Sequence, residues 1–450
     1  MNRIGKRANA VFLLVLILLG GLGFFVTEYF QNGSKWVMTQ GNPHVYQGDK
    51  LTHGQVVDRE GVFLMNLDEH RTYASTVEIR QSTLHWLGDR QGNIHAPLLH
   101  NYRQQLVGFN PVTGLYAYSD QDCAVLTLSA QVQMVAQEAL GDRRGTVAVY
   151  NYKTGQLLCA VTSPTYDPDH EPQQALDGMY MNRFLQSAYV PGSIFKIVTT
   201  AAAIEYIPDI QEQTFQCTGR VEYGPDAVTC EKAHGTLDFD SAMAQSCNCA
   251  YARIIEQIGQ ERLSDYVEKT MVTQSIRFDG ITSASGNFHV TDAAPVELAW
   301  SGIGQHKDQI NPARFLAFVG AIANGGQGPK PHVMAMVKNG DRVTYEAKTV
   351  MDERIISQEV AAQLQRMMRN NVTEKYGDEN FHGLTVCAKS GTGQVGGGKK
   401  ANAMFAGFVA DQEYPLAFVV AVEEGGYGRA TCVPIIAKVL QSCKDVMDRS

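Results

Sequence analysis

The composition of this chain, with 44% hydrophobic and 19% charged residues among 450, is that of a folded protein with room for two domains. Its formal net charge of −8 argues against nucleic acid as the main partner, because proteins that bind phosphates usually carry a basic surface. A polymer of neutral or weakly charged units remains compatible with this charge.

The first thirty residues differ from the rest of the chain. Arg3, Lys6 and Arg7 precede an apolar stretch over residues 8–27 that is long enough to cross a bilayer as a helix. A cleaved signal peptide, the alternative, would have a shorter apolar core and a clear small-residue cleavage site. We therefore predict a cytoplasmic tail at residues 1–7 and a single transmembrane anchor at 8–28. The basic side of the anchor should face the cytoplasm, with the remaining chain outside.

Two unequal regions follow the anchor. Residues 29–120 combine Gly, Asn, Asp and His with short strand-like pieces, such as GQVVDREGVFLMN at 54–66, and are too few for a large enzyme domain. We predict a small N-terminal pedestal domain there and one larger domain at residues 121–450.

The larger domain has strand patterns at its two ends and helix patterns between them. Two strands joined by a turn are predicted within residues 145–163, helices within 194–206, 239–259 and 312–326, and antiparallel strands within 383–390, 402–410 and 415–424. A last helix should run from about Val433 to Met447. This order favours an α+β fold, an antiparallel β-sheet flanked by helices, over repeated βαβ units.

A serine and a lysine lie three residues apart in an otherwise apolar segment. Ser193 and Lys196 would share one face of a helix, and they form the only Ser-x-x-Lys in the chain. A serine hydroxyl needs a base to become a good nucleophile, and a lysine kept neutral by apolar surroundings can act as that base. The alternative is a lysine whose stem packs while its ammonium reaches water.

Two later motifs favour the catalytic interpretation. Ser246 and Asn248, in a Ser-Cys-Asn sequence between helix and loop, supply a hydroxyl and an amide. Lys389, Ser390, Gly391 and Thr392 are predicted at the end of a strand, where a cation, a hydroxyl and an open backbone could hold a carboxylate. In this order the three motifs are those of serine β-lactamases and penicillin-binding proteins.

Three similar motifs are less informative. Lys153, Thr154 and Gly155 fit the turn of a hairpin, and Ser285-Gly286-Asn287 lies in a predicted loop. The GTGQVG at residues 391–396 matches a nucleotide-binding fingerprint, but such a fingerprint needs a following helix, whereas we predict a strand there.

Nine cysteines would lie in a compartment where disulfides can persist. Cys217 and Cys230 flank a polar, turn-rich segment and are a candidate disulfide. Free thiols are an equal alternative, since the number of cysteines is odd and the pairing cannot be deduced from sequence.

The chain resembles the penicillin-binding transpeptidases, especially their monofunctional, membrane-anchored class B members. The resemblance covers about residues 120–445 and includes the segments at 126–140, 145–168, 182–196, 321–326 and 405–410. It implies peptide cross-linking of peptidoglycan without glycan synthesis, covalent inhibition by β-lactams, and neither a metal nor an organic cofactor. A membrane-embedded glycosyltransferase is the partner that the resemblance implies.

The resemblance also implies roles for the motif residues. Ser193 would attack a D-Ala-D-Ala stem peptide with Lys196 as base, Ser246 would carry a proton to the leaving amine, and Asn248 would bind substrate. Lys389 would support the electrostatics and Ser390 would lie near the substrate carboxylate. The backbone N–H groups of Ser193 and Thr392 would stabilise the oxyanion. A D,D-carboxypeptidase, a β-lactamase or a β-lactam-sensing receptor could use the same residues.

Overall fold

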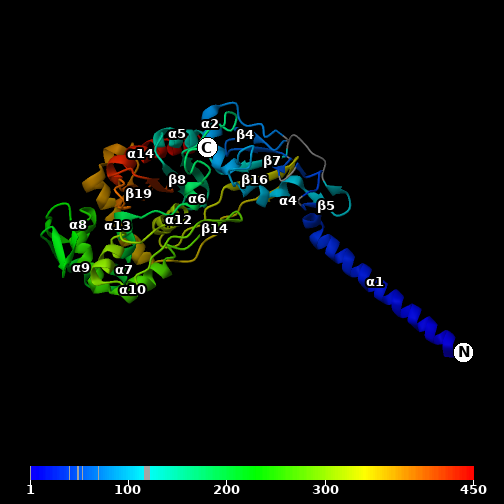
Figure 1. Ribbon diagram of the computed structural model, residues 1–450, viewed down its shortest axis with the longest axis horizontal. Helices are drawn as coiled ribbons and strands as arrows, with labels where there is room; N and C mark the ends of the chain where they lie inside the picture. Colours follow the sequence, from blue (N-terminus) through cyan, green and yellow to red (C-terminus); the bar gives the residue numbers. More distant parts are fainter. Residues whose placement is uncertain are drawn as a thin grey trace.

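The computed structural model describes residues 2–39, 41–47, 50–52, 54–68, 70–115 and 122–449. The predicted domain boundary between residues 120 and 121 lies outside these ranges. The described chain forms an elongated body from which one long helix projects (Figure 1).

The larger domain is built on a five-stranded antiparallel sheet in the order β18-β19-β20-β8-β9. Its strands are β8 (Gly145–Asn151), β9 (Leu157–Ser163), β18 (Val386–Gly393), β19 (Asn402–Val409) and β20 (Leu416–Val422). The predicted strands at both ends of the domain thus meet in one sheet. The α+β fold is confirmed.

Helices cover both faces of this sheet, which explains why β8, β9, β19 and β20 are buried over nearly their whole length rather than at alternate residues. Phe405 of β19 points toward α5 (Ala130–Leu140) and α14 (Gly428–Met447), whereas its neighbours Met404 and Ala406 belong to the core on the other face. That second core contains α12 (Pro312–Ala323), which begins with Asn311 as N-cap and a proline in its first turn.

A helical lobe lies beside the sheet, at the end of the molecule opposite the projecting helix (Figure 1). Its main helices are α7 (Lys196–Tyr206), α8 (Phe239–Ala244), α9 (Asn248–Ile258), α10 (Gln260–Lys269), α11 (Pro295–Gly302) and α13 (Gln358–Asn371). Two small hairpins join this lobe, formed by β10 (Thr214–Cys217) with β13 (Gly235–Asp238) and by β11 (Arg220–Tyr223) with β12 (Asp226–Thr229). A short helix α6 (Arg183–Gln186) and the hairpin of β14 (Arg277–Phe278) and β15 (Ile281–Thr282) complete the connections.

The N-terminal region contains a second five-stranded sheet in the order β17-β16-β7-β3-β4. Its strands β3 (Gln55–Val57) and β4 (Phe63–Asn66) come from the predicted pedestal, but β7 (Cys123–Leu126), β16 (Met334–Asn339) and β17 (Arg342–Glu346) come from later in the chain. The smaller elements here are β1 (Tyr46–Gln47), β2 (Lys50–Leu51), α2 (Val77–Leu87), α3 (Leu98–Asn101), α4 (Arg103–Val107), β5 (Phe109–Asn110) and β6 (Gly114–Leu115). This sheet is therefore assembled from three segments that lie far apart in the sequence.

A buried ion pair joins the two regions. Arg80 of α2 donates two hydrogen bonds of 2.7 Å to the carboxylate of Asp167, and these hydrogen bonds hold the pKa of Asp167 below its usual range. Both side chains are at most 10% exposed. Breaking the pair would leave an unpaired charge in the interior, so it fixes the pedestal against the larger domain.

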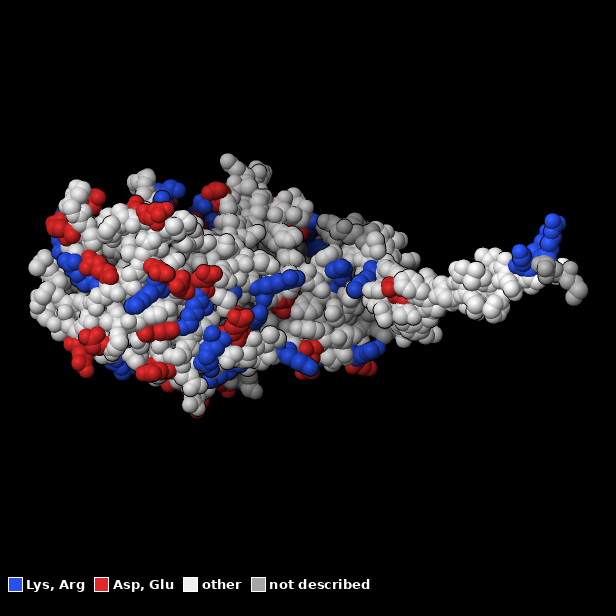
Figure 2. All heavy atoms as spheres, turned by 90° about the horizontal axis from the view of Figure 1, so that it is seen from below, with Lys and Arg blue, Asp and Glu red and all other residues white. Residues whose placement is uncertain are grey.

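The first helix, α1 (Asn2–Val37), contains the predicted membrane span. Its most apolar 18-residue window has a mean hydropathy of 2.7 and none of that window is buried, and it is the one such helix among the described residues. Figure 2 shows this helix as an uncharged rod with Lys and Arg at its tip, which fits Arg3, Lys6 and Arg7. Length, composition and exposure together support a membrane anchor.

Candidate active site

The three predicted motifs line one cavity of about 550 Å³ between the helical lobe and strand β18. Ser193, Ser246, Asn248, Lys389, Ser390 and Thr392 all contribute to its wall. These residues span two hundred positions of the sequence and come from three separate segments. Another cavity, of about 420 Å³ around Tyr102 and Lys330, contains none of them.

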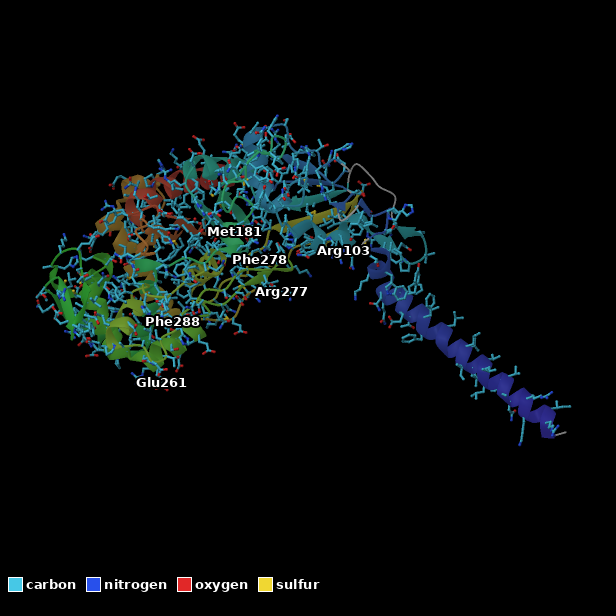
Figure 3. The ribbon with its side chains drawn as sticks, in the orientation of Figure 1. Arg103, Met181, Glu261, Arg277, Phe278 and Phe288 are labelled. Carbon is cyan, nitrogen blue, oxygen red and sulfur yellow. The ribbon has the colours of Figure 1, made fainter. Side chains whose placement is uncertain are left out.

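Ser193 lies in a 3₁₀ turn, Gly192–Ile194, that leads into α7 at Lys196. The predicted helix therefore begins later than expected, although the intervening Phe195 keeps helical backbone angles. Phe288, labelled in Figure 3, stacks on the Phe195 ring at 5.4 Å between centroids and helps to hold the turn. Ser193 faces the cavity while Lys196 lies buried below it.

Two glycines allow the turn Gly192–Ile194, called the nucleophile turn below, to lie directly against β18. Gly192 has φ of +56°, and a Cβ atom there would collide with the backbone of Thr392. A Cβ on Gly391 would in turn collide with the carbonyl oxygen of Pro191. The backbone N–H of Gly192 also donates to Gly304 at 2.8 Å. Any larger side chain at either glycine would push Ser193 away from the strand.

Lys196 is fully buried, so the alternative of a lysine that reaches water is wrong. Its Nζ donates to the Ser246 carbonyl oxygen at 2.8 Å, to Ser246 Oγ at 3.2 Å and to Asn248 Oδ1 at 2.8 Å. The nitrogen also lies 5.0 Å from the centre of the Tyr251 ring. Burial lowers the pKa of Lys196 to about 8, against 10.5 for an ordinary lysine. The amine can therefore be neutral near physiological pH.

The turn between α8 and α9 brings Ser246 and Asn248 to this lysine. Ser246 has φ of +52°, an uncommon conformation for a residue with a side chain. Cys247 caps α9 by accepting a hydrogen bond from Ala250 N at 3.4 Å, and Asn248 Nδ2 donates to Thr229 O at 2.8 Å. On the other side, Ser246 N donates to Met243 O at 3.1 Å and Cys247 N donates to Ala242 O at 3.0 Å, so the left-handed Ser246 closes the C-terminal end of α8.

Lys389 approaches the same serine from the sheet. It is 1% exposed, and its Nζ donates to Ser246 Oγ at 3.1 Å and to Ser390 O at 3.0 Å. Burial, and then the nearby charge of Lys196, lower the pKa of Lys389 well below its ordinary value. Two lysines that share one hydroxyl cannot both carry a charge at low cost.

The sequence predicts that a strand ends at the third motif. In the structure, β18 instead continues through the whole motif. Lys389, Ser390, Gly391 and Thr392 all pair with β19, in register with Ala406, Phe405, Met404 and Ala403. The motif is therefore part of the sheet, and its geometry is as rigid as the sheet.

Sequence reasoning missed two groups that hold this strand. Tyr376 accepts a hydrogen bond from Ser390 N at 2.8 Å and its hydroxyl lies 3.0 Å from Ser390 Oγ. Gln305 donates to Thr392 O at 2.8 Å. Tyr376 ends a π-helical turn, Val372–Tyr376, and no motif in the sequence marks either residue. Arg429, an exposed cation in the cavity wall, was missed for the same reason.

Two of the similar motifs lie away from the cavity, and the third overlaps the end of β18. Lys153 is in the turn between β8 and β9 and donates to Asn324 at 2.7 Å, while Asn287 pairs with Gln309 through its backbone. The glycine-rich segment at 391–396 leads into β19, not into a helix. It therefore lacks the helix that a nucleotide-binding fingerprint requires.

The candidate disulfide between Cys217 and Cys230 is absent, and all nine cysteines are free thiols. Both sulfur atoms nonetheless belong to one compact group beside Ser246, together with His234 and Cys247. Of the two alternatives that the sequence left open for Cys217 and Cys230, the structure contains the free thiols, which lie close together.

The comparison of the whole sequence with protein families agrees with this geometry. Residues 145–441 match the family described as the penicillin binding protein transpeptidase domain. The chain therefore belongs to this family, and the resemblance found from the three motifs is confirmed.

Several individual proteins are similar to this chain in sequence or in structure. The peptidoglycan D,D-transpeptidase PbpA of Mycolicibacterium smegmatis is 28% identical over 339 residues, which are 67% of each protein. Stage V sporulation protein D of Bacillus subtilis is also 28% identical, over 70% of this chain and 52% of that protein. Among solved structures, penicillin-binding protein A of M. tuberculosis in a ceftriaxone acyl-enzyme complex has a TM-score of 0.76 and 21% identity, covering 88% of this chain and 98% of that one. This structure shows that the fold is shared.

Proposed function

We propose that this protein is a peptidoglycan D,D-transpeptidase that cross-links stem peptides through an acyl-enzyme on Ser193. The observation that carries the proposal is the fully buried Lys196, whose pKa of about 8 and contacts with Ser246 and Asn248 make it a base beside the nucleophile turn. The relatives named as peptidoglycan D,D-transpeptidases support the same reaction.

In the first half-reaction the Ser193 Oγ attacks the carbonyl carbon between the two D-alanines, and Lys196 takes its proton. The new C–O bond forms and the C–N bond breaks. Ser246, which accepts hydrogen bonds from both lysines, passes a proton to the departing amine of D-alanine. In the second half-reaction an acceptor amine attacks the ester, loses its proton by the reverse route and frees Ser193.

Strand β18 would hold the substrate. Asn248 and the edge of β18 at Gly391 and Thr392 bind its backbone, and the N–H groups of Ser193 and Thr392 stabilise the oxyanion. The terminal carboxylate lies near Ser390, with Arg429 at the cavity wall as a further cation. A carboxylate bound there would also restore a positive charge on Lys389, because a nearby opposite charge favours the ammonium.

The anchor would place this site outside the cytoplasm. Arg3, Lys6 and Arg7 at the free end of α1 should remain on the cytoplasmic side. The catalytic domain then faces the compartment in which peptidoglycan is assembled. A membrane-embedded glycosyltransferase would supply the glycan strands that this protein joins.

Labelling with a fluorescent penicillin followed by peptide mapping tests the nucleophile. The label should be found on the peptide that contains Ser193, and it should be absent from Ser193→Ala. A label on another residue, or no label on the folded wild-type protein, would contradict the proposal.

A thioester donor with and without an acceptor amine then separates the alternatives. A transpeptidase should form the amide product. Hydrolysis alone would indicate a carboxypeptidase, rapid turnover of penicillin would indicate a β-lactamase, and stable acylation without transfer would indicate a receptor.

A further inference from the structure

A compact group of sulfur and nitrogen atoms lies beside the turn that carries Ser246. It contains one atom from each of Cys217, Cys230, His234 and Cys247, and all four atoms lie within 4.8 Å of one another. Cys217 ends β10, Cys230 follows β12, His234 precedes β13 and Cys247 is the N-cap of α9. Four ligands from four different elements thus meet at one point, although the predicted reaction makes no use of them.

Two distances within the group match those of a tetrahedral metal site, and Cys249 Sγ lies next to the group, 3.5 Å from Cys230 Sγ. Cys230 Sγ lies 3.7 Å from Cys247 Sγ, and Cys217 Sγ lies 3.4 Å from His234 Nδ1. With zinc bonds of about 2.3 Å to sulfur and about 2.0 Å to nitrogen, a tetrahedron has S···S edges of about 3.8 Å and S···N edges of about 3.5 Å. Three cysteines and one histidine are also a common ligand set of structural zinc sites.

The surroundings of the group suit bound thiolates. The backbone N–H of Ala250 points at Cys247 Sγ at 3.4 Å, and the N–H of Cys249 points at Cys230 Sγ at 3.4 Å. Both donors lie in the first turn of α9, where the helix dipole favours negative charge. Donors of this kind orient and stabilise the ligands of a metal.

An ion could reach the group from the active-site cavity. Cys230 and His234 are partly exposed and line that cavity, whereas Cys217 and Cys247 are buried behind them. The site thus has an entry path and a closed inner side.

We propose that Cys217, Cys230, His234 and Cys247 bind one structural zinc ion, and that this ion fixes the turn that carries Ser246. Binding releases the three thiol protons and leaves a complex with a net charge of −1, since Zn²⁺ is offset by three thiolates and a neutral imidazole. Because Cys247 lies between Ser246 and Asn248, the ion would tie both residues to the hairpins. The four protein ligands leave no open position, so the ion positions groups and takes no part in the reaction.

Metal content tests the proposal without relying on the enzyme's activity. The full chain, purified in detergent and reconstituted with zinc sulfate, should contain one zinc per chain by elemental analysis. Cys217→Ser and His234→Ala should lose at least about 80% of that zinc. Cys123→Ser, which removes a buried cysteine in the pedestal sheet, is the matched control and should keep all of it.

Cobalt titration of the wild-type chain gives a second measurement that does not depend on whether the variants fold. Co²⁺ should produce the absorption of a tetrahedral thiolate complex at one equivalent, and zinc should remove it. Substoichiometric zinc, equal zinc in the His234→Ala variant, or a Cys217–Cys230 disulfide in a peptide map of the zinc-treated protein would each overturn the proposal.

Removing the metal should also change the rate of acylation. This measurement distinguishes a failure of the zinc proposal from a failure of the proposed function. Chelation should slow the acylation of Ser193 by penicillin about tenfold or more, and zinc should restore the rate. A protein that binds zinc but is never acylated would refute the transpeptidase and leave the metal site standing.

Discussion

The two walls of the active site are built in different ways. Lys389, Ser390 and Thr392 lie on β18, where eight consecutive residues pair with β19 inside a five-stranded sheet. Ser246 lies on a turn between two helices and has a left-handed backbone conformation, and Asn248 begins the second of these helices. Backbone hydrogen bonds between strands position the first wall, whereas backbone hydrogen bonds within one helix end, from Ser246 N to Met243 O and from Cys247 N to Ala242 O, position the second. The Ser246 hydroxyl joins the two walls, because it accepts hydrogen bonds from both Lys196 and Lys389.

The largest effect should come from replacing the base. Lys196→Arg keeps a buried cation but cannot supply a neutral amine, because a guanidinium keeps its proton at any pH that the protein survives. We expect acylation by a fluorescent penicillin to fall by about 10³-fold or more, within the range for losing a general base. Lys153→Arg, in the hairpin turn, is the control and should acylate at the wild-type rate. Comparable labelling of the two variants would refute the role of Lys196.

A smaller but still large effect should follow from separating the nucleophile turn from the sheet. Gly391→Val places a side chain against the Pro191 carbonyl and should displace Ser193 from β18. Because a displacement of about 1 Å can cost about 100-fold in rate, acylation should fall by about that factor.

Circular dichroism and thermal melting must accompany this measurement. Gly23→Val, in the exposed helix α1 where a Cβ atom meets open space, is the control. If Gly391→Val acylates normally, the close contact of the turn with β18 is not required.

A change of about tenfold is expected when the pH alone is raised from 6 to 7. Because burial lowers the pKa of Lys196 to about 8, the neutral amine becomes more abundant as pH rises toward that value. The second-order rate constant of acylation should therefore increase about tenfold from pH 6 to pH 7, rise more slowly beyond, and level off above about pH 8. Stopped-flow measurements with a chromogenic β-lactam would show this profile. A rise that continues to pH 10 would mean that the lysine keeps its ordinary pKa.

The smallest effect should come from loosening β18. Tyr376→Phe removes the hydroxyl that bonds Ser390 N and Ser390 Oγ, at a cost of about 1 to 1.4 kcal/mol. We expect the rate of acylation to fall about five- to tenfold, with little change in pH dependence. Tyr414→Phe, on a tyrosine that bonds Asp448 near the chain's end, is the matched control. Equal rates for both variants would show that the sheet alone fixes Ser390.

Sequence patterns predicted the parts of the fold that local chemistry determines. The apolar runs of β8, β9, β19 and β20 and the hairpin turn at Lys153 follow directly from strand periodicity and turn residues. The three motifs predicted Ser193, Lys196, Ser246, Asn248 and Lys389 as neighbours, and one cavity contains or overlies them all. Their roles in catalysis remain predictions.

Tertiary contacts account for what the sequence did not reveal. Nothing near Tyr376 or Gln305 marks them as supports of β18, because their partners are backbone groups 14 and 87 residues further along the chain. The same holds for the four elements that bring Cys217, Cys230, His234 and Cys247 together. Spacing suggested a two-cysteine bond, and only the fold could show a third cysteine and a histidine at the same point.

The mixed origin of the pedestal sheet decides how the protein can be shortened. Strand β7 lies between β3 and β16. Cutting the chain after residue 120 would remove β3 and β4 and expose the backbone of β7 as an open edge, which other chains could join to start aggregation. A soluble fragment should therefore begin between α1 and β1, where the cut removes the apolar helix and leaves both sheets intact.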